Sequence, residues 1–212
     1  MKIRRRGRRQ PTRSLDAWGW SGAHTLDRVS HLNEKCIAAA ASRLVEEESR
    51  STKVLSVYRD LWRRMDLIGC KRAARCPVLL FDLHFENPVW WHWIVHHGPR
   101  PVKTPDTEPL LPIAESAPLL REILVEACVI ALSHPRAARL VFGMAPAVVE
   151  AVTDLRASEI DSIVFTHAAE LRLRWADNLV FWKNLLLAAT DGTDGDITQV
   201  RLHCLQLLGN SN

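Results

Sequence analysis

The stretch from Leu119 to Leu132 restricts the possible folds more than any other part of this sequence. Its apolar residues recur at intervals of three and four, and its three charged residues fall on the opposite side, which is the pattern of an amphipathic α-helix. Ser116 can cap such a helix, and Pro118 suits its first turn, where no N–H is needed. A helix with so long an apolar face needs a partner surface, so we expect a mainly α-helical protein.

The residues that follow predict a series of short elements. Pro135 starts a helix that ends at Gly143, and Pro146 opens the next one. Ser158 is expected to cap a third helix, with Asp161 at the reciprocal position of a capping box. An alternating segment and two helices complete the series: a strand at Leu171–Trp175, a helix at Asp177–Leu185 and a last helix at Asp196–Leu208.

Several of these segments resemble the bacterial flagellar activator subunit FlhD, most clearly His134–Met144, Val148–Leu155 and Ser158–Val164. In that family an apolar helix leads through a small-residue turn into two short helices. A basic strand-like piece and an Asp-started helix follow, and Leu171–Trp175 and Asp177–Leu185 look similar to that pair. The resemblance covers roughly residues 117–208 and implies a helical, DNA-binding subunit with dimer contacts.

The resemblance to FlhD also implies DNA contacts in the second half, at Arg172, Arg174 and Lys183. The alternative for these side chains is a solvated basic edge that binds nothing. The family has an intersubunit cysteine in this segment, whereas residues 171–175 contain none. We therefore do not expect a disulfide-linked dimer.

Two helices separated by a short polar turn are predicted in the first half. The first runs from Asn33, a suitable N-cap, to Glu47, and the second runs from Thr52 to Arg64. This order is typical of a helix-turn-helix, in which hydroxyl groups at a helix start bind phosphates and Arg or Lys reaches base edges. An ordinary amphipathic helix pair has the same pattern. The candidate DNA contacts are Arg50, Ser51, Thr52, Lys53, Arg59, Arg63 and Arg64.

The same region resembles the N-terminal part of FlhC, the partner of FlhD. The similarity runs from Ala41–Leu44 through Leu55–Leu61. FlhC has a similar Leu-x-x-Tyr-basic-acidic-Leu motif at the end of its helix-turn-helix. Together the two resemblances imply that one chain carries pieces of two partner subunits. The four-cysteine zinc site of FlhC has no counterpart here.

The positive charge of the chain is concentrated at its start. Seven cations precede the first acid, Asp16, and the remaining chain has 21 basic and 24 acidic residues. Such a tail attracts phosphate backbones without reading sequence, so we expect residues 1–30 to form a flexible arm. A solubilising arm, or a start codon placed too far upstream, is the alternative. The candidate DNA contacts of the arm are Arg4, Arg5, Arg6, Arg8 and Arg9.

Residues 81–97 hold an unusual concentration of aromatic and histidine side chains. Asn87 and Pro88 predict a helix start, and Gly98 its end. His92 and His96 have the helical spacing of metal ligands, but no third ligand is identifiable, so we predict no metal site. A helix with tryptophans on more than one side is better explained by burial between domains or protomers.

The segment from Gly98 to Pro118 contains six prolines, a density that blocks helix and sheet. We place a domain boundary there and predict two small helical domains joined by a proline-rich linker. Leu110, Leu111 and Ile113 can pin the linker to a surface. The predicted divisions are an arm at 1–30, a helix-turn-helix domain at 31–98, a linker at 99–117 and an FlhD-like domain at 118–212.

The composition indicates a cytoplasmic protein that does not enter a membrane. No window of 18 or more apolar residues exists, and no signal-peptide pattern follows Met1. The five cysteines are odd in number and scattered, which fits reduced thiols better than a disulfide framework.

Enzymatic function is not expected, because the sequence has no Walker loop, no glycine-rich dinucleotide turn and no nucleophile elbow. We predict no cofactor. The leading hypothesis is an FlhDC-type activator that binds double-stranded promoter DNA as an oligomer, with itself or an FlhC- or FlhD-like subunit, and recruits RNA polymerase. The alternative is a helical adaptor or antagonist of such a complex that does not touch DNA. Flagellar genes and mobile-element transfer genes are both conceivable targets.

Overall fold

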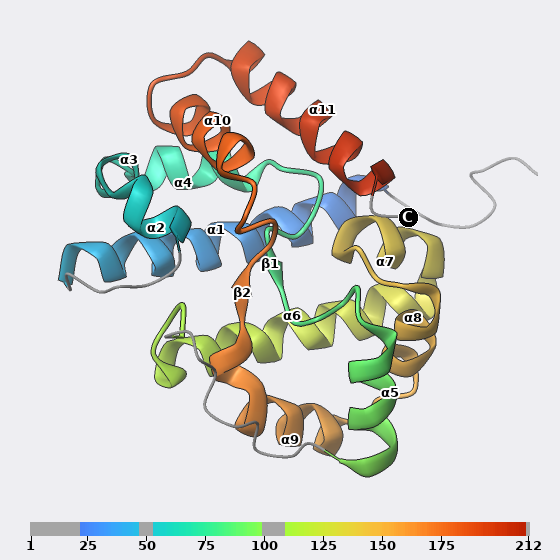
Figure 1. The fold of residues 1–212 in the computed structure, drawn as a ribbon. Helices are drawn as coiled ribbons and strands as arrows, with labels where there is room; N and C mark the ends of the chain where they lie inside the picture. The colour runs from blue at the N-terminus through green and yellow to red at the C-terminus, as the bar shows by residue number, and fades with distance from the viewer. Residues whose placement is uncertain (1–21, 47–52, 99–108, 211–212) are drawn as a thin grey trace, which may run out of the picture.

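The computed structural model describes residues 22–46, 53–98 and 109–210, and this part of the chain is almost entirely helical (Figure 1). The prediction of a mainly α protein is confirmed. The first half contains α1 (Gly22–Glu46), α2 (Lys53–Val57), α3 (Arg59–Arg63), α4 (Leu67–Ala74), β1 (Phe81–Asp82) and α5 (Pro88–His97). The second half contains α6 (Ile113–Ser133), α7 (Pro135–Phe142), α8 (Pro146–Thr153), α9 (Ala157–His167), a 3-10 turn (Ala168–Glu170), β2 (Arg172–Leu173), α10 (Leu179–Thr190) and α11 (Asp194–Asn210).

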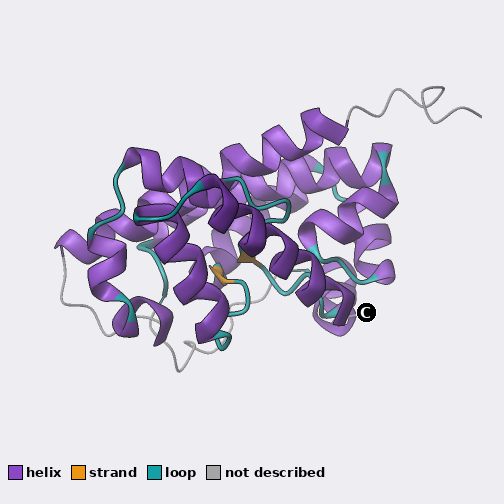
Figure 2. Ribbon diagram, turned by 90° about the horizontal axis from the view of Figure 1, so that it is seen from above, coloured by secondary structure: helices purple, strands orange, loops and turns teal. Residues whose placement is uncertain are grey.

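The two long helices α1 and α6 pack on each other at the centre, and the shorter helices surround them (Figures 1 and 2). α1 packs against α3 and α4, whereas α6 packs against α7, α8 and α9. None of the helices among the described residues is long and apolar enough to cross a membrane.

The buried apolar side chains form one continuous cluster that extends from Val29 to Leu208. The predicted boundary at residues 99–117 does not divide this cluster. Residues 99–108 lie outside the described part of the chain, and residues 113–117 form the first turns of α6. Leu110 and Leu111 are buried, as expected of residues that pin the connection, but Ile113 is exposed.

The start of α6 differs from the prediction. The helix begins at Ile113 with Pro112 at the N-cap, so Ser116 is an internal, buried residue and not a cap. Pro118 consequently lies inside the helix, where it cannot donate to the carbonyl one turn earlier. Capping chemistry did not locate this start, because Pro112 makes no side-chain capping hydrogen bond whereas Ser116, a typical N-cap residue, lies inside the helix.

The start of α1 also lies earlier than predicted. The helix begins at Gly22, so residues 22–30, which were expected to belong to the arm, are helical. Asn33 is not an N-cap. It lies in the middle of α1, is fully buried, and donates its side-chain amide to the carbonyl of Val78 at 2.9 Å. Its amide oxygen accepts the N–H of Leu80 at 2.8 Å, and α1 is thereby fixed to the segment that leads into β1.

The other predicted helix ends are partly confirmed. Asn87 caps α5, and Gly143 follows α7 with a left-handed φ of 66°. α9, however, starts after Arg156, whose N–H donates to Glu159 at 2.7 Å, and not after Ser158. α11 begins at Asp194, and Asp196 accepts the N–H of Thr193 at 2.7 Å.

The strands β1 and β2 join the two halves of the chain. They pair antiparallel, with Phe81 opposite Leu173 and Asp82 opposite Arg172. In Figure 1 the pair lies in the middle of the molecule, between the two long helices. The strand-like segment predicted at 171–175 therefore exists, but it is only two residues long, with Arg172 exposed and Leu173 buried.

Candidate nucleic-acid interface

The helices α2, α3 and α4 carry the densest positive charge in the described part of the chain. Residues 53–75 contain seven cations and two carboxylates, whereas the rest of the sequence after Arg13 has 14 cations and 22 acids. Four of the seven are predicted site residues, and three were not foreseen. The seven cations are Lys53, Arg59, Arg63, Arg64, Lys71, Arg72 and Arg75.

Local structure explains why α4 presents its cations outward. Asp66 caps the helix by accepting the N–H of Gly69 at 2.7 Å. The buried side of α4 consists of small residues, Gly69, Cys70, Ala73 and Ala74, which allow a close approach to α1 and α10. The opposite side is therefore left for long and charged side chains.

Three of the seven cations bind residues 191–194, in the loop after α10 and at the start of α11. Arg64 forms an ion pair with Asp191, and Arg75 lies 3.5 Å from the carboxylate of Asp194. Arg72 donates to the carbonyl of Gly192 at 3.4 Å. Arg64 and Arg75 are thereby partly neutralised by carboxylates of the second half of the chain.

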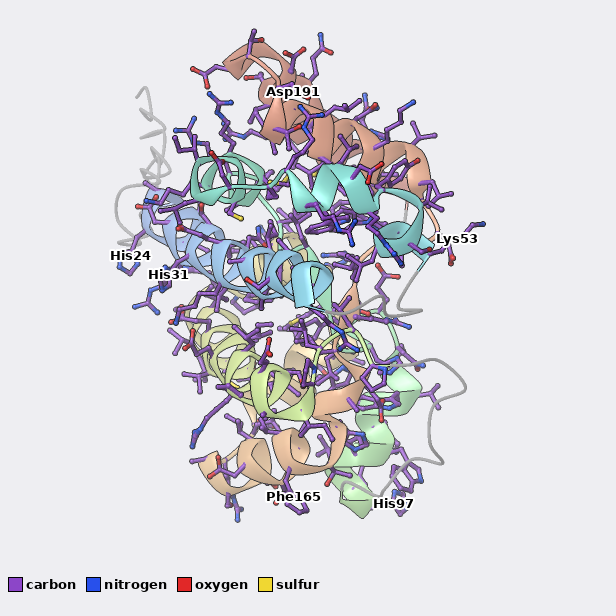
Figure 3. All side chains as sticks on the ribbon, turned by 90° about the vertical axis from the view of Figure 1, so that its left-hand side faces the viewer. His24, His31, Lys53, His97, Phe165 and Asp191 are labelled. Atoms are coloured by element: carbon purple, nitrogen blue, oxygen red, sulfur yellow. The ribbon has the colours of Figure 1, made fainter. Side chains whose placement is uncertain are left out.

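The remaining cations face solvent. Lys53 and Lys71 are exposed and Arg59 is half-buried, and none of the three has a carboxylate partner among the described residues. Arg63 is exposed as well. Figure 3 shows Lys53 at the periphery of the molecule. At the start of α4, Leu67 and Ile68 are 64% and 61% exposed, so this helix combines apolar contact area with positive charge.

The predicted helix at 52–64 is two helices, α2 and α3, that meet at Tyr58. Val54, Leu55 and Trp62 are buried, so both helices have one side packed into the core. The cationic residues extend past Arg64 into α4, which the sequence analysis did not single out. The missed signal was the pair Lys71-Arg72 followed by Arg75, one helical turn apart.

The prediction that Arg174 contacts DNA is wrong, because its side chain is only 3% exposed. The guanidinium lies over the Trp175 ring at 4.9 Å and 3.5 Å from Glu86. Burial lowers the pKa of Arg174, and its Nε and Nη1 atoms have no hydrogen-bond partner in the described structure. The alternative of a solvated edge is equally wrong for this residue.

Arg172 is exposed but is paired with a buried carboxylate. Its Nε and Nη2 atoms donate to the same oxygen of Asp82 at 2.9 and 2.7 Å. Asp82 is buried and also accepts the N–H groups of His84 and Phe85. The charge of Arg172 thus compensates a buried anion, and we do not include it in the interface.

The remaining predicted DNA contacts are Lys183 and a group of residues that the structure does not describe. Lys183 is exposed on α10, which packs on α3 and α4. The other group lies outside the described residues: Arg4, Arg5, Arg6, Arg8, Arg9, Arg50, Ser51 and Thr52.

A second polar cluster lies beside the β1–β2 pair, around Glu170. Its carboxylate accepts hydrogen bonds from His167 at 2.7 Å and His84 at 3.0 Å, and the Trp90 ring lies about 5 Å from both imidazoles. Burial raises the pKa of Glu170, but the hydrogen bonds from His167 and His84 outweigh it and lower the pKa to about 2. Because the cluster is largely buried, we assign it to stability and not to binding.

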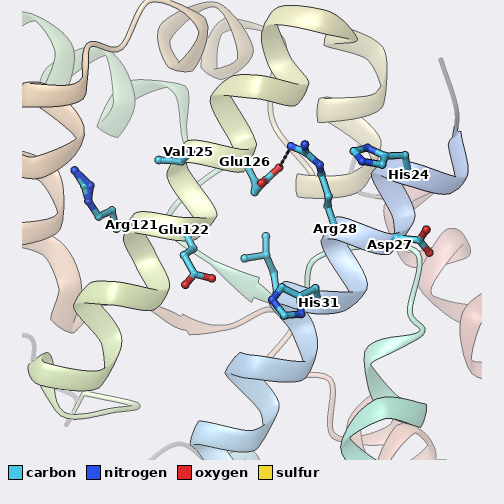
Figure 4. Close-up of a pocket in the computed structure, with 9 residues that line it drawn as sticks. His24, Asp27, Arg28, His31, Arg121, Glu122, Val125 and Glu126 are labelled. Carbon is cyan, nitrogen blue, oxygen red and sulfur yellow. Dashed lines mark hydrogen bonds and ion pairs between the residues drawn. The ribbon is translucent and has the colours of Figure 1, made fainter. Parts of the chain in front are cut away.

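A groove of about 510 Å³ lies between α1 and α6 (Figure 4). Its charges are largely paired: Arg28 with Glu126 at 2.7 Å, and Arg121 with Asp161 on α9 at 2.7 Å. The described residues contain no group of three His, Cys, Asp or Glu side chains able to hold a metal ion. The α2–α4 surface is therefore the strongest candidate site.

Comparisons with family models, curated proteins and solved structures gave no match to this chain.

Proposed function

We propose that the chain is a DNA-binding protein whose α2–α4 surface contacts the phosphate backbone of a duplex. The observation that carries the proposal is the concentration of seven cations between Lys53 and Arg75, four of which face solvent, in an otherwise acidic body. Lys and Arg side chains at such a surface release counterions from DNA, which is the main source of affinity in DNA binding. The basic arm before Asp16 adds to the same attraction.

The order of α3 and α4 supports a helix-turn-helix role for this surface. The two helices are joined by the three residues 64–66, and α4 packs on α1 with its basic side outward. In such a motif the second helix enters the major groove. The exposed side chains at its start, Leu67 and Ile68, are suited to apolar contact with thymine methyl groups, and Lys71 to phosphate or base edges.

The resemblance to FlhD and FlhC extends the proposal to transcription activation, with binding to promoter DNA and recruitment of RNA polymerase. An adaptor that does not touch DNA is the second candidate, because Phe165 on α9 is 90% exposed. An aromatic ring so fully in solvent is typical of a protein contact.

Fluorescence anisotropy with a labelled promoter duplex, titrated at several salt concentrations, tests DNA binding. We compare the wild type with the triple variant Lys53→Ala, Arg59→Ala, Lys71→Ala. The slope of log K against log salt is negative, and each lost phosphate contact reduces its magnitude by about 0.9. The triple variant should therefore have a slope that is less steep by up to about 3 units. Sequence-selective binding should survive competitor DNA.

The matched control is the pair Arg136→Ala and Arg139→Ala, which removes exposed cations from α7. The control should retain the wild-type slope. An equal loss in both variants, or no binding by the wild type, contradicts the proposed interface. If the triple variant stays folded and keeps full activity in a promoter reporter, the adaptor hypothesis is favoured.

A further inference from the structure

The elements of the first half recur in the second half at a constant distance along the sequence. β1 begins at residue 81 and β2 at residue 172. The capping residues of α5 and α10 are Asn87 and Asn178, and each accepts the N–H three residues later at 3.0 Å. The separation is 91 residues in both cases (81 to 172, 87 to 178).

The same separation relates the buried faces of the two long helices. Both faces begin with a buried hydroxyl residue, Thr25 in α1 and Ser116 in α6. Further buried pairs follow in register: Val29 and Leu120, Leu32 and Ile123, Asn33 and Leu124, Cys36 and Ala127, Ile37 and Cys128, and Ala40 and Ala131. A shared burial register over four turns indicates that α1 and α6 have the same role in two related units.

The turns that lead into α5 and α10 are also alike. His84 and Trp175 both have a φ of 52°, and they are the only non-glycine residues of the described chain with positive φ. This conformation is uncommon for bulky side chains. Each lies three residues before the capping asparagine, with its ring about 5 Å from the aromatic ring six positions later. A rare conformation at equivalent positions is strong evidence of a common origin.

The aromatic pairs within α5 and α10 match as well. The rings of Trp90 and Trp91 cross at 76° with centroids 5.2 Å apart, and those of Phe181 and Trp182 cross at 76° with centroids 5.6 Å apart. Trp91 and Trp182 are both fully buried. The two matching segments of sequence are Asn87-Pro-Val-Trp-Trp and Asn178-Leu-Val-Phe-Trp.

Each of these two helices packs on the opposite half of the chain. α5 packs on α8, and α10 packs on α3 and α4 (Figure 1). The ring of Trp182 on α10 lies 5.9 Å from that of Trp62 on α3. The strand pair shows the same reciprocity. Phe81 pairs with Leu173, and the residues at the equivalent positions of the other half are Arg172 (91 residues after Phe81) and Asp82 (91 residues before Leu173). These two residues form the other pair of the ladder. Reciprocal contacts of this kind define a two-fold relationship.

We infer that residues 22–97 and 113–190 are two copies of one helical unit that exchange their last helices about an approximate two-fold axis through the β1–β2 pair. A single chain thereby has the arrangement of an intertwined dimer. Neither copy covers its own core, so the connection at 98–112 links two interdependent units.

If the α2–α4 surface binds DNA as proposed, the duplication does not provide a second such surface. At the positions that correspond to Arg59, Arg63 and Lys71, the second copy has Glu150, Asp154 and Ser162. A phosphate backbone is repelled by these carboxylates. The scaffold is thus doubled but the basic surface is single, and one chain binds one duplex.

The exchange is tested without DNA by cutting the folded chain between the copies. A specific protease site is inserted after Lys103 in the full-length protein, which is cleaved while native and analysed by size-exclusion chromatography with light scattering. The two pieces should stay together at the mass of the intact chain, 24.0 kDa. Separation into two folded pieces overturns the inference.

Matched substitutions in the cleaved chain test the equivalence of the copies. Trp91→Ala and Trp182→Ala should each weaken the association of the pieces by a similar factor, at least tenfold. Trp91→Phe and Trp182→Phe, which keep an aromatic ring, should restore most of it and show that the effect is not misfolding. The controls Val89→Ala and Val180→Ala change exposed residues and should have no effect. A strong loss from one tryptophan only overturns the two-fold relationship, whether or not the protein binds DNA.

Discussion

Asn33 and Leu80 are joined by a buried hydrogen bond of 2.8 Å that connects the middle of α1 to the segment before β1. The same side chain donates to the carbonyl of Val78 at 2.9 Å. One amide therefore satisfies two backbone groups that are shielded from water. Because an unpaired buried polar group costs about 1–3 kcal/mol, this residue has a large effect on stability.

Asn33→Ala should lower the free energy of unfolding by about 3 kcal/mol, since it leaves the Leu80 N–H and the Val78 carbonyl without partners. Urea denaturation followed by circular dichroism measures this change. Asn184→Ala, at an exposed position of α10, is the control and should change stability by less than about 0.5 kcal/mol. Equal stabilities for the two variants contradict the assigned role of Asn33.

Arg174→Met should leave stability unchanged or raise it by about 1 kcal/mol, because a buried charge with unpaired nitrogens is replaced by an apolar chain of similar length. Arg174→Ala should instead cost about 2 kcal/mol or more through the cavity it leaves. Neither variant should alter the salt slope of DNA binding. A reduced slope in Arg174→Met, with an intact fold, contradicts the conclusion that Arg174 is structural.

Glu170→Gln should make stability less dependent on pH in the acid range. The pKa of Glu170 is lowered from 4.5 to about 2, so the unfolded state binds more protons between these values. Its contribution is complete above pH 4.5 and is lost as the pH falls toward 2; it amounts to at most about 3 kcal/mol. Unfolding free energies measured from pH 6 to 2 should fall less steeply in this variant than in the wild type, and Glu150→Gln, an exposed control on α8, should follow the wild type.

The five thiols should resist alkylation in the native protein, because all five cysteines are buried. Burial raises the pKa of Cys36 to about 12 and that of Cys128 to about 11, so little thiolate forms at pH 8. Titration with a chromogenic disulfide reagent should detect five thiols in guanidinium chloride and almost none without it. Rapid reaction of one thiol in the native state contradicts the described packing.

The sequence allowed the helical class and several helix ends to be predicted, because Asn87, Pro135 and Gly143 carry local signals that tertiary contacts do not override. The same logic failed at Asn33 and Ser116. Both residue types can cap a helix, but their hydrogen-bond partners or burial depend on segments distant in the chain. Local pattern contains no information about such partners.

Part of the candidate DNA-binding surface could be predicted, because local charge density is visible in the sequence whereas the partners of each charge are not. Charge counts show that Lys53, Arg59 and Arg63 belong to a basic stretch, and all three remain at the surface or half-buried. The alternation of Arg172 and Arg174 also suggests a basic face, yet Arg174 is buried and the exposed Arg172 is paired with Asp82. The presence of a partner such as Asp82, 90 residues away, cannot be deduced from spacing.

The reciprocal packing of α5 and α10 has a consequence for synthesis on the ribosome. When the first half has emerged, the surface of α3 and α4 that α10 covers is still bare, and Trp62 is exposed to solvent. Burial must wait until the chain is nearly complete, so contacts between distant residues delay folding and leave the nascent protein prone to association. Protection by a chaperone during translation is therefore expected to matter more for this protein than for one whose halves mature independently.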